Sequence, residues 1–132
     1  MNDFEKLLTV RDDDLDDLQH VNNVRYVQWI QDVSKEHWTS VAPEDIRSQS
    51  IWVVMSHHIS YKSAAKLGDT IRINTSIAKS KGALSERVVE MHNDKTNELL
   101  LRSTTEWCLL NARTQRPMRI PDAVKKLFEA QA

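Results

Sequence analysis

The stretch DLDDLQHVNNVRYVQWI, residues 14–30, decides the fold of this chain, because an acidic polar loop here passes directly into an apolar helix. Large apolar side chains recur with the i, i+3, i+4, i+7 spacing typical of one buried helix face, at Tyr26, Trp29, Ile30 and Val33. Asn22 or Asn23 can cap this helix, since a short side-chain oxygen accepts a free N–H of the first turn. We therefore expect a helix over residues 23–38.

Alternation of apolar and polar side chains in the remainder of the chain predicts five strands. We place them over residues 4–10, 51–61, 71–77, 84–91 and 99–109. In the second strand, alternation puts six side chains on one face, namely Ile51, Val53, Met55, His57, Ile59 and Tyr61. Residues 80–82 predict a hairpin connection in which Gly82 can supply a positive φ. Residues 122–130 predict a short amphipathic helix.

One long apolar helix and five strands, the last four of them in hairpin sequence, predict an α+β fold in a single domain, residues 1–132. The helix is too apolar for a surface position, so we expect it to lie in the concave face of one antiparallel sheet. Open sheet edges and an apolar flank favour pairing with a second copy. We therefore expect a homodimer or a homotetramer.

Composition gives no general reason to expect nucleic acid or a membrane as partner. The net charge is −1, from 18 basic and 19 acidic residues, and no apolar run approaches the roughly 20 residues that a membrane helix needs. The first five residues are acidic and lack the apolar core of a signal peptide. Cys108 is the single cysteine, so an intramolecular disulfide is impossible. These features predict a cytoplasmic protein.

Two arrangements resemble metal sites and fail on spacing. His57 and His58 are adjacent on a predicted strand, so their side chains point to opposite faces and cannot bind one ion together. The acidic run 12–17 places aspartates at alternate positions, as a calcium loop does. However, Asp17 and Asn23 stand where that loop requires glycine and glutamate. Since the chain also lacks a glycine-rich phosphate loop, we expect neither a metal nor a cofactor.

The pattern Asp-x-x-x-His-Val-Asn-Asn-x-x-Tyr, from Asp16 to Tyr26, resembles the signature of the hotdog-fold thioesterases. This is the family of 4-hydroxybenzoyl-CoA thioesterase and the acyl-CoA thioester hydrolases. The run from Gln19 to Tyr26 is similar in particular to the plant acyl-carrier-protein thioesterases. Two shorter matches extend the resemblance along the chain, at Leu67-Gly68-Asp69 and Arg119-Ile120-Pro121.

The resemblance implies hydrolysis of an acyl-CoA or acyl-carrier-protein thioester, without a cofactor, in a channel at a subunit interface. Asp16 would act as a nucleophile or as a general base. His20 would assist proton transfer or polarise the carbonyl, or it would only brace the loop before the helix. Val21 lies where the N–H groups and positive dipole of a helix start could stabilise an oxyanion. Three more residues could contact substrate, although capping and core packing explain them more simply: Asn22, Asn23 and Tyr26.

Two other functions remain open. A hotdog domain of this type could bind an acyl thioester or a protein partner without turnover. Gln19 and Leu18 favour this alternative, because many bacterial relatives have glycine at the first position and the plant enzymes have asparagine at the second. A hotdog dehydratase agrees less well with the sequence, because the Asn-Asn-x-x-Tyr pattern is typical of the thioesterases.

Overall fold

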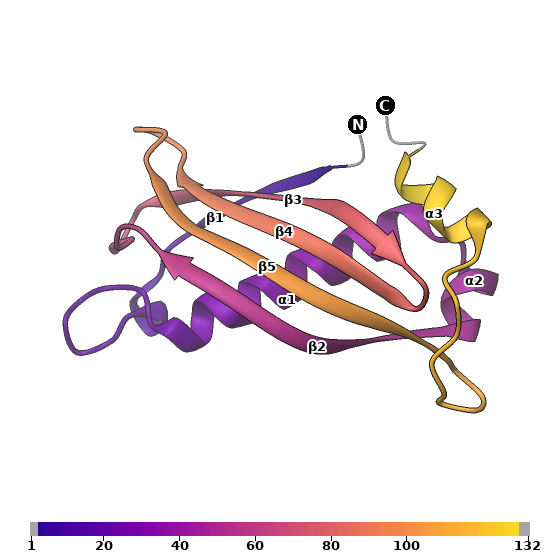
Figure 1. Cartoon of the computed structure of the whole chain (residues 1–132). Helices are drawn as coiled ribbons and strands as arrows, with labels where there is room; N and C mark the ends of the chain where they lie inside the picture. Colours follow the sequence, from indigo (N-terminus) through magenta and orange to yellow (C-terminus); the bar gives the residue numbers. More distant parts are fainter. Residues whose placement is uncertain (1–2, 130–132) are drawn as a thin grey trace.

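A computed structural model describes residues 3–129 of the chain, in which one antiparallel sheet wraps around one long helix (Figure 1). The helix is α1, Asn23–Val41. The strands lie in the order β1-β3-β4-β5-β2, with bounds Phe4–Thr9 for β1, Ser50–Tyr61 for β2, Thr70–Lys81 for β3, Leu84–Asn93 for β4 and Leu99–Asn111 for β5. Two short helices lie at the end of the sheet where α1 ends, α2 (Glu44–Gln49) and α3 (Asp122–Glu129).

The long helix begins where the sequence predicts and continues three residues further. Asn22 is its N-cap, since the Asn22 Oδ1 accepts the Val24 N–H at 3.0 Å. The helix ends at Val41, just before Pro43, whose ring cannot continue it. The predicted C-terminal helix is also present and extends to Glu129, while its predicted last residue, Ala130, lies outside the described residues.

Three consecutive strands, β3, β4 and β5, form an antiparallel meander, and β1 and β2 flank it as the two edges. The predicted hairpin connection between β3 and β4 is confirmed, with Gly82 at a φ of 62°. This left-handed backbone is open to glycine at no steric cost. In the turn between β4 and β5, Asn97 has a φ of 63°, a conformation that asparagine tolerates better than most residues.

The predicted face of β2 is wrong in its first half. The pairing of β2 with β5 shifts between Val54 and Ser56, so Met55 is an extra residue that the partner strand does not match. Such a bulge exchanges the two faces of a strand on either side of it. The side chains that share the inner face are therefore Trp52, Val54, His57, Ile59 and Tyr61. Met55 is 58% exposed on this edge.

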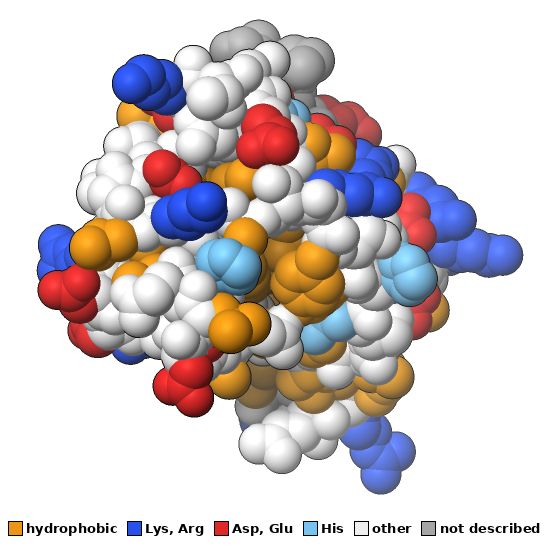
Figure 2. Space-filling view, turned by 90° about the vertical axis from the view of Figure 1, so that its left-hand side faces the viewer, with side chains coloured by type: hydrophobic (Ala, Val, Ile, Leu, Met, Phe, Trp, Pro, Cys, Tyr) orange, Lys and Arg blue, Asp and Glu red, His pale blue; other side chains and the backbone are white. Residues whose placement is uncertain are grey.

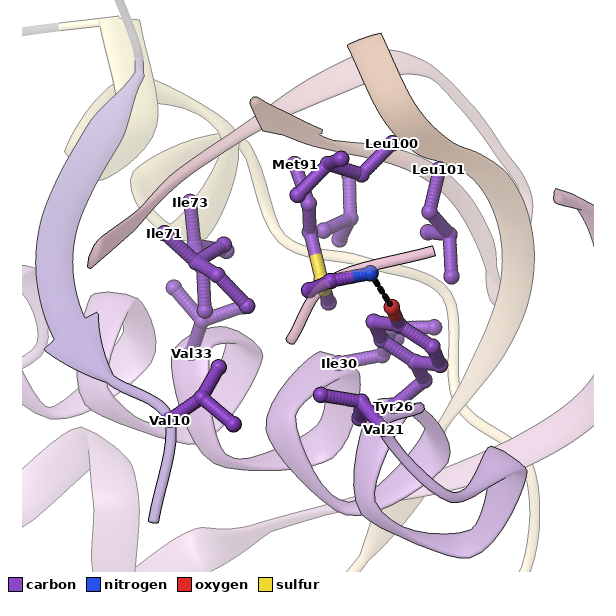
Figure 3. Packing of buried hydrophobic residues seen from close by; sticks show 12 residues of the cluster. Val10, Val21, Tyr26, Ile30, Val33, Ile71, Ile73, Met91, Leu100 and Leu101 are labelled. Atoms are coloured by element: carbon purple, nitrogen blue, oxygen red, sulfur yellow. Dashed lines mark hydrogen bonds between the residues drawn. The ribbon is translucent and has the colours of Figure 1, made fainter. Parts of the chain in front are cut away.

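The core lies between the buried face of α1 and the concave face of the sheet (Figure 3). Ile30 and Val33 are completely buried against apolar side chains of the strands, among them Ile71, Ile73, Met91 and Leu101. Full burial of each such side chain stabilises the fold by about 1.5–3 kcal/mol. A second cluster lies towards the other end of α1, where Trp38 and Trp52 pack near Leu109 and Phe128. The α+β prediction is confirmed, and the arrangement is the hotdog fold.

Candidate functional site

The residues just before α1 fold back on themselves into a closed loop. Leu15 and Val21 form an antiparallel bridge across its base. Inside it, the Asp16 N–H donates to the His20 carbonyl at 2.8 Å, and the Gln19 N–H donates to the Asp16 carbonyl at 3.0 Å. The φ of Gln19 is 61°, a left-handed conformation that costs a side-chain-bearing residue about 1–2 kcal/mol. Glycine would adopt this conformation without that cost.

Asp16 stabilises the loop from its centre. Its Oδ1 accepts the backbone N–H groups of Leu18, at 2.9 Å, and His20, at 3.2 Å. The side chain is half-buried, and its Oδ2 accepts no hydrogen bond from the residues that the structure describes. The loop therefore fixes the direction of this carboxylate and leaves one oxygen available to a ligand or to water.

Backbone donors around the start of α1 are largely occupied. The His20 N–H donates to Asp16, the Val21 N–H donates to the Ala65 carbonyl at 3.1 Å, and the Asn22 N–H donates to the Asp14 carbonyl at 2.8 Å. Within residues 3–129 the Asn23 N–H makes no hydrogen bond. If an oxyanion is stabilised by the backbone here, Asn23 supplies the free donor.

Tyr26 belongs to the core, as its place on the apolar face predicts. Its side chain is 4% exposed and lies edge-on to Trp29, with ring centroids 5.7 Å apart. Its hydroxyl accepts the Ala65 N–H at 3.2 Å, which Figure 3 shows as a dashed line. Burial raises the pKa of this phenol. Tyr26 and Val21 both bond to Ala65, so they attach the β2–β3 connection to the loop that holds Asp16.

Apolar surface surrounds the loop. Figure 2 faces the end of the molecule that carries it, and hydrophobic and histidine side chains gather near the middle of this face. The segments that meet at this end contribute four large apolar side chains that are more than half exposed, namely Leu18, Val24, Tyr61 and Leu67. Exposed apolar groups that cluster in this way are typical of ligand-binding or protein-binding surfaces.

The two adjacent histidines of β2 point to opposite faces, as predicted. His57 faces inward, where its Nδ1 lies 2.8 Å from the Thr105 Oγ1, and burial lowers its pKa. His58 is exposed and pairs with Thr104 in the ladder. Among residues 3–129, no three His, Cys, Asp or Glu side chains come close enough together to bind a metal ion. No helix in the same range has the length and apolar character needed to cross a membrane.

A second polar cluster, which the motif does not indicate, lies under the C-terminal half of α1. Arg87 of β4 is only 4% exposed. Its Nη1 donates to the His37 Nδ1 at 2.9 Å and to the Thr75 Oγ1 at 3.0 Å. The sequence did carry a signal for this position, because alternation along β4 places Arg87 on the same face as Val89 and Met91. The motif from Asp16 to Tyr26 gives no indication of this cluster.

In this cluster Arg87 carries the positive charge and His37 is neutral. A guanidinium has no acceptor, so the His37 Nδ1 accepts the bond and the imidazole is neutral. Burial, together with the neighbouring Arg87 charge, lowers the pKa of His37 to about 4. Burial lowers the pKa of Arg87 to about 9, which still leaves it protonated at neutral pH. No carboxylate of residues 3–129 lies within 4 Å of the Arg87 nitrogens.

Comparison with known sequences points to one family. The family model of the acyl-ACP thioesterase N-terminal domain matches residues 1–128. A chloroplastic palmitoyl-acyl carrier protein thioesterase of Cuphea hookeriana is 32% identical over 87 residues, which are 66% of this chain and 21% of that protein. A chloroplastic dodecanoyl-[acyl-carrier-protein] hydrolase of Umbellularia californica is 33% identical over 75 residues, 57% of this chain and 20% of that protein. The chain thus spans about a fifth of the length of these relatives.

Solved structures share the fold at low sequence identity. The 12:0-ACP thioesterase from Umbellularia californica superposes with a TM-score of 0.83 at 22% identity, over 98% of this chain and 50% of that chain. A 1,4-dihydroxy-2-naphthoyl-CoA thioesterase from Synechocystis superposes with a TM-score of 0.84 at 15% identity, over 98% of this chain and 97% of that one. The fold of residues 3–129, the motif from Asp16 to Tyr26 and the match over residues 1–128 agree, and the chain belongs to the family of the acyl-ACP thioesterase N-terminal domain.

Proposed function

We propose that the chain hydrolyses an acyl thioester of coenzyme A or of acyl-carrier protein to a free carboxylic acid and a thiol. The observation that supports this most directly is the state of Asp16, whose carboxylate is held by two backbone N–H groups and keeps one oxygen free. Family membership supplies the reaction class. The apolar side chains around the loop suit an acyl group.

Asp16 can serve this reaction in either of two ways. As a general base it takes a proton from water, the water oxygen attacks the thioester carbonyl, and the C–S bond breaks to release the thiolate. As a nucleophile it attacks the carbonyl itself, the C–S bond breaks to release the thiolate and leave a mixed anhydride, and water then hydrolyses that anhydride to the free acid and the Asp16 carboxylate. In both cases we assign to His20 the transfer of a proton to the departing sulfur, and the Asn23 N–H is a candidate donor to the carbonyl oxygen.

A second candidate function is the binding of an acyl thioester or a protein partner without turnover. One observation favours it specifically. The Asp16 Oδ1 and the N–H groups of His20 and Val21 already have partners inside the fold, so these groups are explained as structural members of the loop. A binding domain of this kind would keep the apolar surface and release no thiol.

Assembly and location are part of the proposal. β2 is a twelve-residue strand at one edge of the sheet, and its outer side pairs with no strand among residues 3–129. Met55 and Tyr61 are more than half exposed along it. Such an edge favours pairing with a second copy, so we propose a homodimer or a homotetramer. Light scattering at micromolar concentration would return a monomer mass if this is wrong. We propose a cytoplasmic location, since the one cysteine, Cys108, is buried and unpaired, and cell fractionation tests it.

The test of the reaction is a thiol-release assay with acyl-CoA and acyl-carrier-protein substrates of graded chain length. Asp16→Asn is the informative variant, because the amide oxygen can still accept the Leu18 and His20 N–H groups while the base is lost. We expect turnover to fall by about a hundredfold or more. Asp17→Asn is the matched control, since Asp17 is the exposed neighbour and makes no side-chain hydrogen bond to residues 3–129.

Three outcomes contradict the proposal. Absence of thiol release by the wild type across the whole panel would favour the binding domain. Near-normal turnover by Asp16→Asn would remove Asp16 from the chemistry. An equal loss in Asp17→Asn would show that charge in the loop matters, rather than the carboxylate at Asp16.

A further inference from the structure

A cavity of about 290 Å³ lies beside the C-terminal half of α1. Gln31, Ser34, Lys35 and Trp38 border it from successive turns of the helix. Aromatic side chains close much of the remainder, namely Trp52, Trp107 and Phe128. The volume is at the lower limit of the ~300–1,000 Å³ typical of small-molecule sites, so it suits a small ligand. None of the residues of the loop around Asp16 lines it.

Arg87 also lines this cavity, and most of its hydrogen-bonding capacity is unused. Both of its hydrogen bonds, to His37 and to Thr75, come from Nη1. Its Nε and Nη2, which together carry three N–H groups, have no partner among residues 3–129. One face of the guanidinium lies over the Phe128 ring, with its central carbon 5.6 Å from the ring centroid.

The bonds from Nη1 hold the guanidinium in one orientation. Thr75 donates its own hydroxyl proton to the Val88 carbonyl at 3.0 Å, so its oxygen is fixed as an acceptor for Arg87. His37 is fixed in turn by stacking on Phe4, at 5.5 Å between ring centroids. A buried cation held rigidly and without a carboxylate partner is costly, because burial removes its hydration. An anionic ligand would offset that cost.

Trp107 adds a second unused donor. Its indole Nε1 is buried and has no hydrogen-bond partner among the described residues, and the same side chain lines the cavity. Buried donors usually have partners, so an unpaired indole N–H in the same cavity as the unused N–H groups of Arg87 indicates that the cavity suits a polar ligand group. The aromatic walls indicate that the remainder of such a ligand is apolar.

We propose that this cavity binds a small free carboxylic acid, whose carboxylate pairs with the Nε and Nη2 of Arg87 and whose apolar body lies against Trp38, Trp52 and Phe128. The planar fork of arginine matches the two oxygens of a carboxylate, and such pairs are among the strongest hydrogen bonds in proteins. This site is separate from the Asp16 loop, and the proposal does not rest on the proposed hydrolysis.

The test is a titration of the full chain with octanoate, octanamide and octylamine, which share one apolar body and differ in charge. Binding is measured by calorimetry and by the 15N resonances of the Arg87 Nε and the tryptophan indoles. We expect octanoate to saturate a site and to shift the Arg87 Nε resonance. Octanamide should bind at least about tenfold more weakly, because it lacks the charge-assisted pair, and octylamine should not bind.

Arg87→Met and Lys35→Met form the matched pair of variants, since both residues line the cavity and only Arg87 is buried. Arg87→Met should lose the preference for octanoate over octanamide, while Lys35→Met should keep it. Equal affinity for octanoate and octanamide, or loss of the preference in Lys35→Met alone, would overturn the proposal. If Arg87→Met does not fold, the wild-type spectrum decides: saturation without a shift of the Arg87 Nε resonance, or no saturation, overturns it.

Discussion

The two ends of α1 hold charged side chains in opposite environments. At the N-terminal end, the Asp16 carboxylate stays half-exposed, and backbone N–H groups of its own loop hold it. Under the C-terminal half, the Arg87 charge is buried and its bonded neighbours, His37 and Thr75, are neutral. A charge that water can reach costs little folding free energy and can react, whereas a buried charge without a partner reduces stability unless a ligand pairs with it. We therefore call the N-terminal end, where we propose catalysis, the reactive end, and the C-terminal end, where we propose ligand binding, the binding end.

The largest effects should come from the reactive end. Asp16→Asn should lower kcat about a hundredfold or more, and His20→Ala should lower it by less, because the His20 N–H that bonds to Asp16 survives the substitution. Steady-state kinetics on one good acyl thioester, with folding checked by circular dichroism, measure both. An equal loss in the two variants, with one limb missing from the pH–rate profile of His20→Ala, would make His20 an obligatory acid or base.

Acid should weaken the fold through the binding end. The pKa of His37 is about 4 in the folded protein and 6.5 for an ordinary histidine, so the unfolded chain takes up its proton first as pH falls. Stability from this residue is complete above pH 6.5 and is lost as pH falls from 6.5 to 4, by up to about 3 kcal/mol. His57, whose pKa is also lowered, acts in the same direction.

Urea unfolding of wild type and His37→Gln at pH 7, 5.5 and 4.5 measures this dependence. The variant should lose less stability between pH 7 and 4.5 than the wild type, since carboxylates common to both proteins cancel in the difference. Parallel pH profiles would show that His37 does not titrate in this range, and the contrast between the two ends of α1 would then be weaker than we infer.

Tyr26→Phe should cost about 1–2 kcal/mol of unfolding free energy, because it leaves the buried Ala65 N–H without an acceptor while the ring keeps its packing. Chemical denaturation measures it. If Tyr26 also contacts substrate, KM or kcat of the variant changes beyond what its stability explains. Kinetic constants equal to wild type would limit Tyr26 to the core.

The smallest expected effect is a difference in stability between variants of two adjacent asparagines. Asn22→Ala should destabilise the protein by about 1 kcal/mol, because the Val24 N–H loses its cap. Asn23→Ala should be within about 0.5 kcal/mol of wild type, since the side chain is exposed and makes no bond to the described residues. Thermal unfolding of the pair checks the cap. If Asn23→Ala lowers kcat without lowering stability, the residue acts on substrate.

Periodicity predicted the fold well because the buried faces of α1 and β3 follow the helix and strand periods closely. Ile30 and Val33, and Ile71 and Ile73, are all completely buried. Periodicity failed in β2, where the extra residue Met55 inverts the face pattern. A bulge depends on how two strands pair, and the sequence of one strand alone does not give its register against the partner strand.

The sequence predicts the polar residues at the N-terminal end of α1 better than those under its C-terminal half. The Asp16 loop lies in a contiguous motif, so eleven consecutive residues reveal it. The Arg87 cluster is assembled from β3, β4 and α1, over sequence separations of 12 and 50 residues. Only the fold brings Thr75 and His37 to Arg87. The strand alternation places Arg87 inside, but it does not say what the arginine meets there.

The order of the strands also sets the order in which the chain can fold. β3, β4 and β5 join through short turns, so they pair at little loop-closure cost, whereas β1 must meet β3, and β2 must meet β5, across long intervening segments. We therefore expect the two edges to pair last and to be the first to open in hydrogen exchange. The apolar face of α1 packs mainly on β3, β4 and β5, so the meander alone can cover it. Because α1 lies in the chain between β1 and β2, we expect its two flanks to be covered only when those edge strands pair.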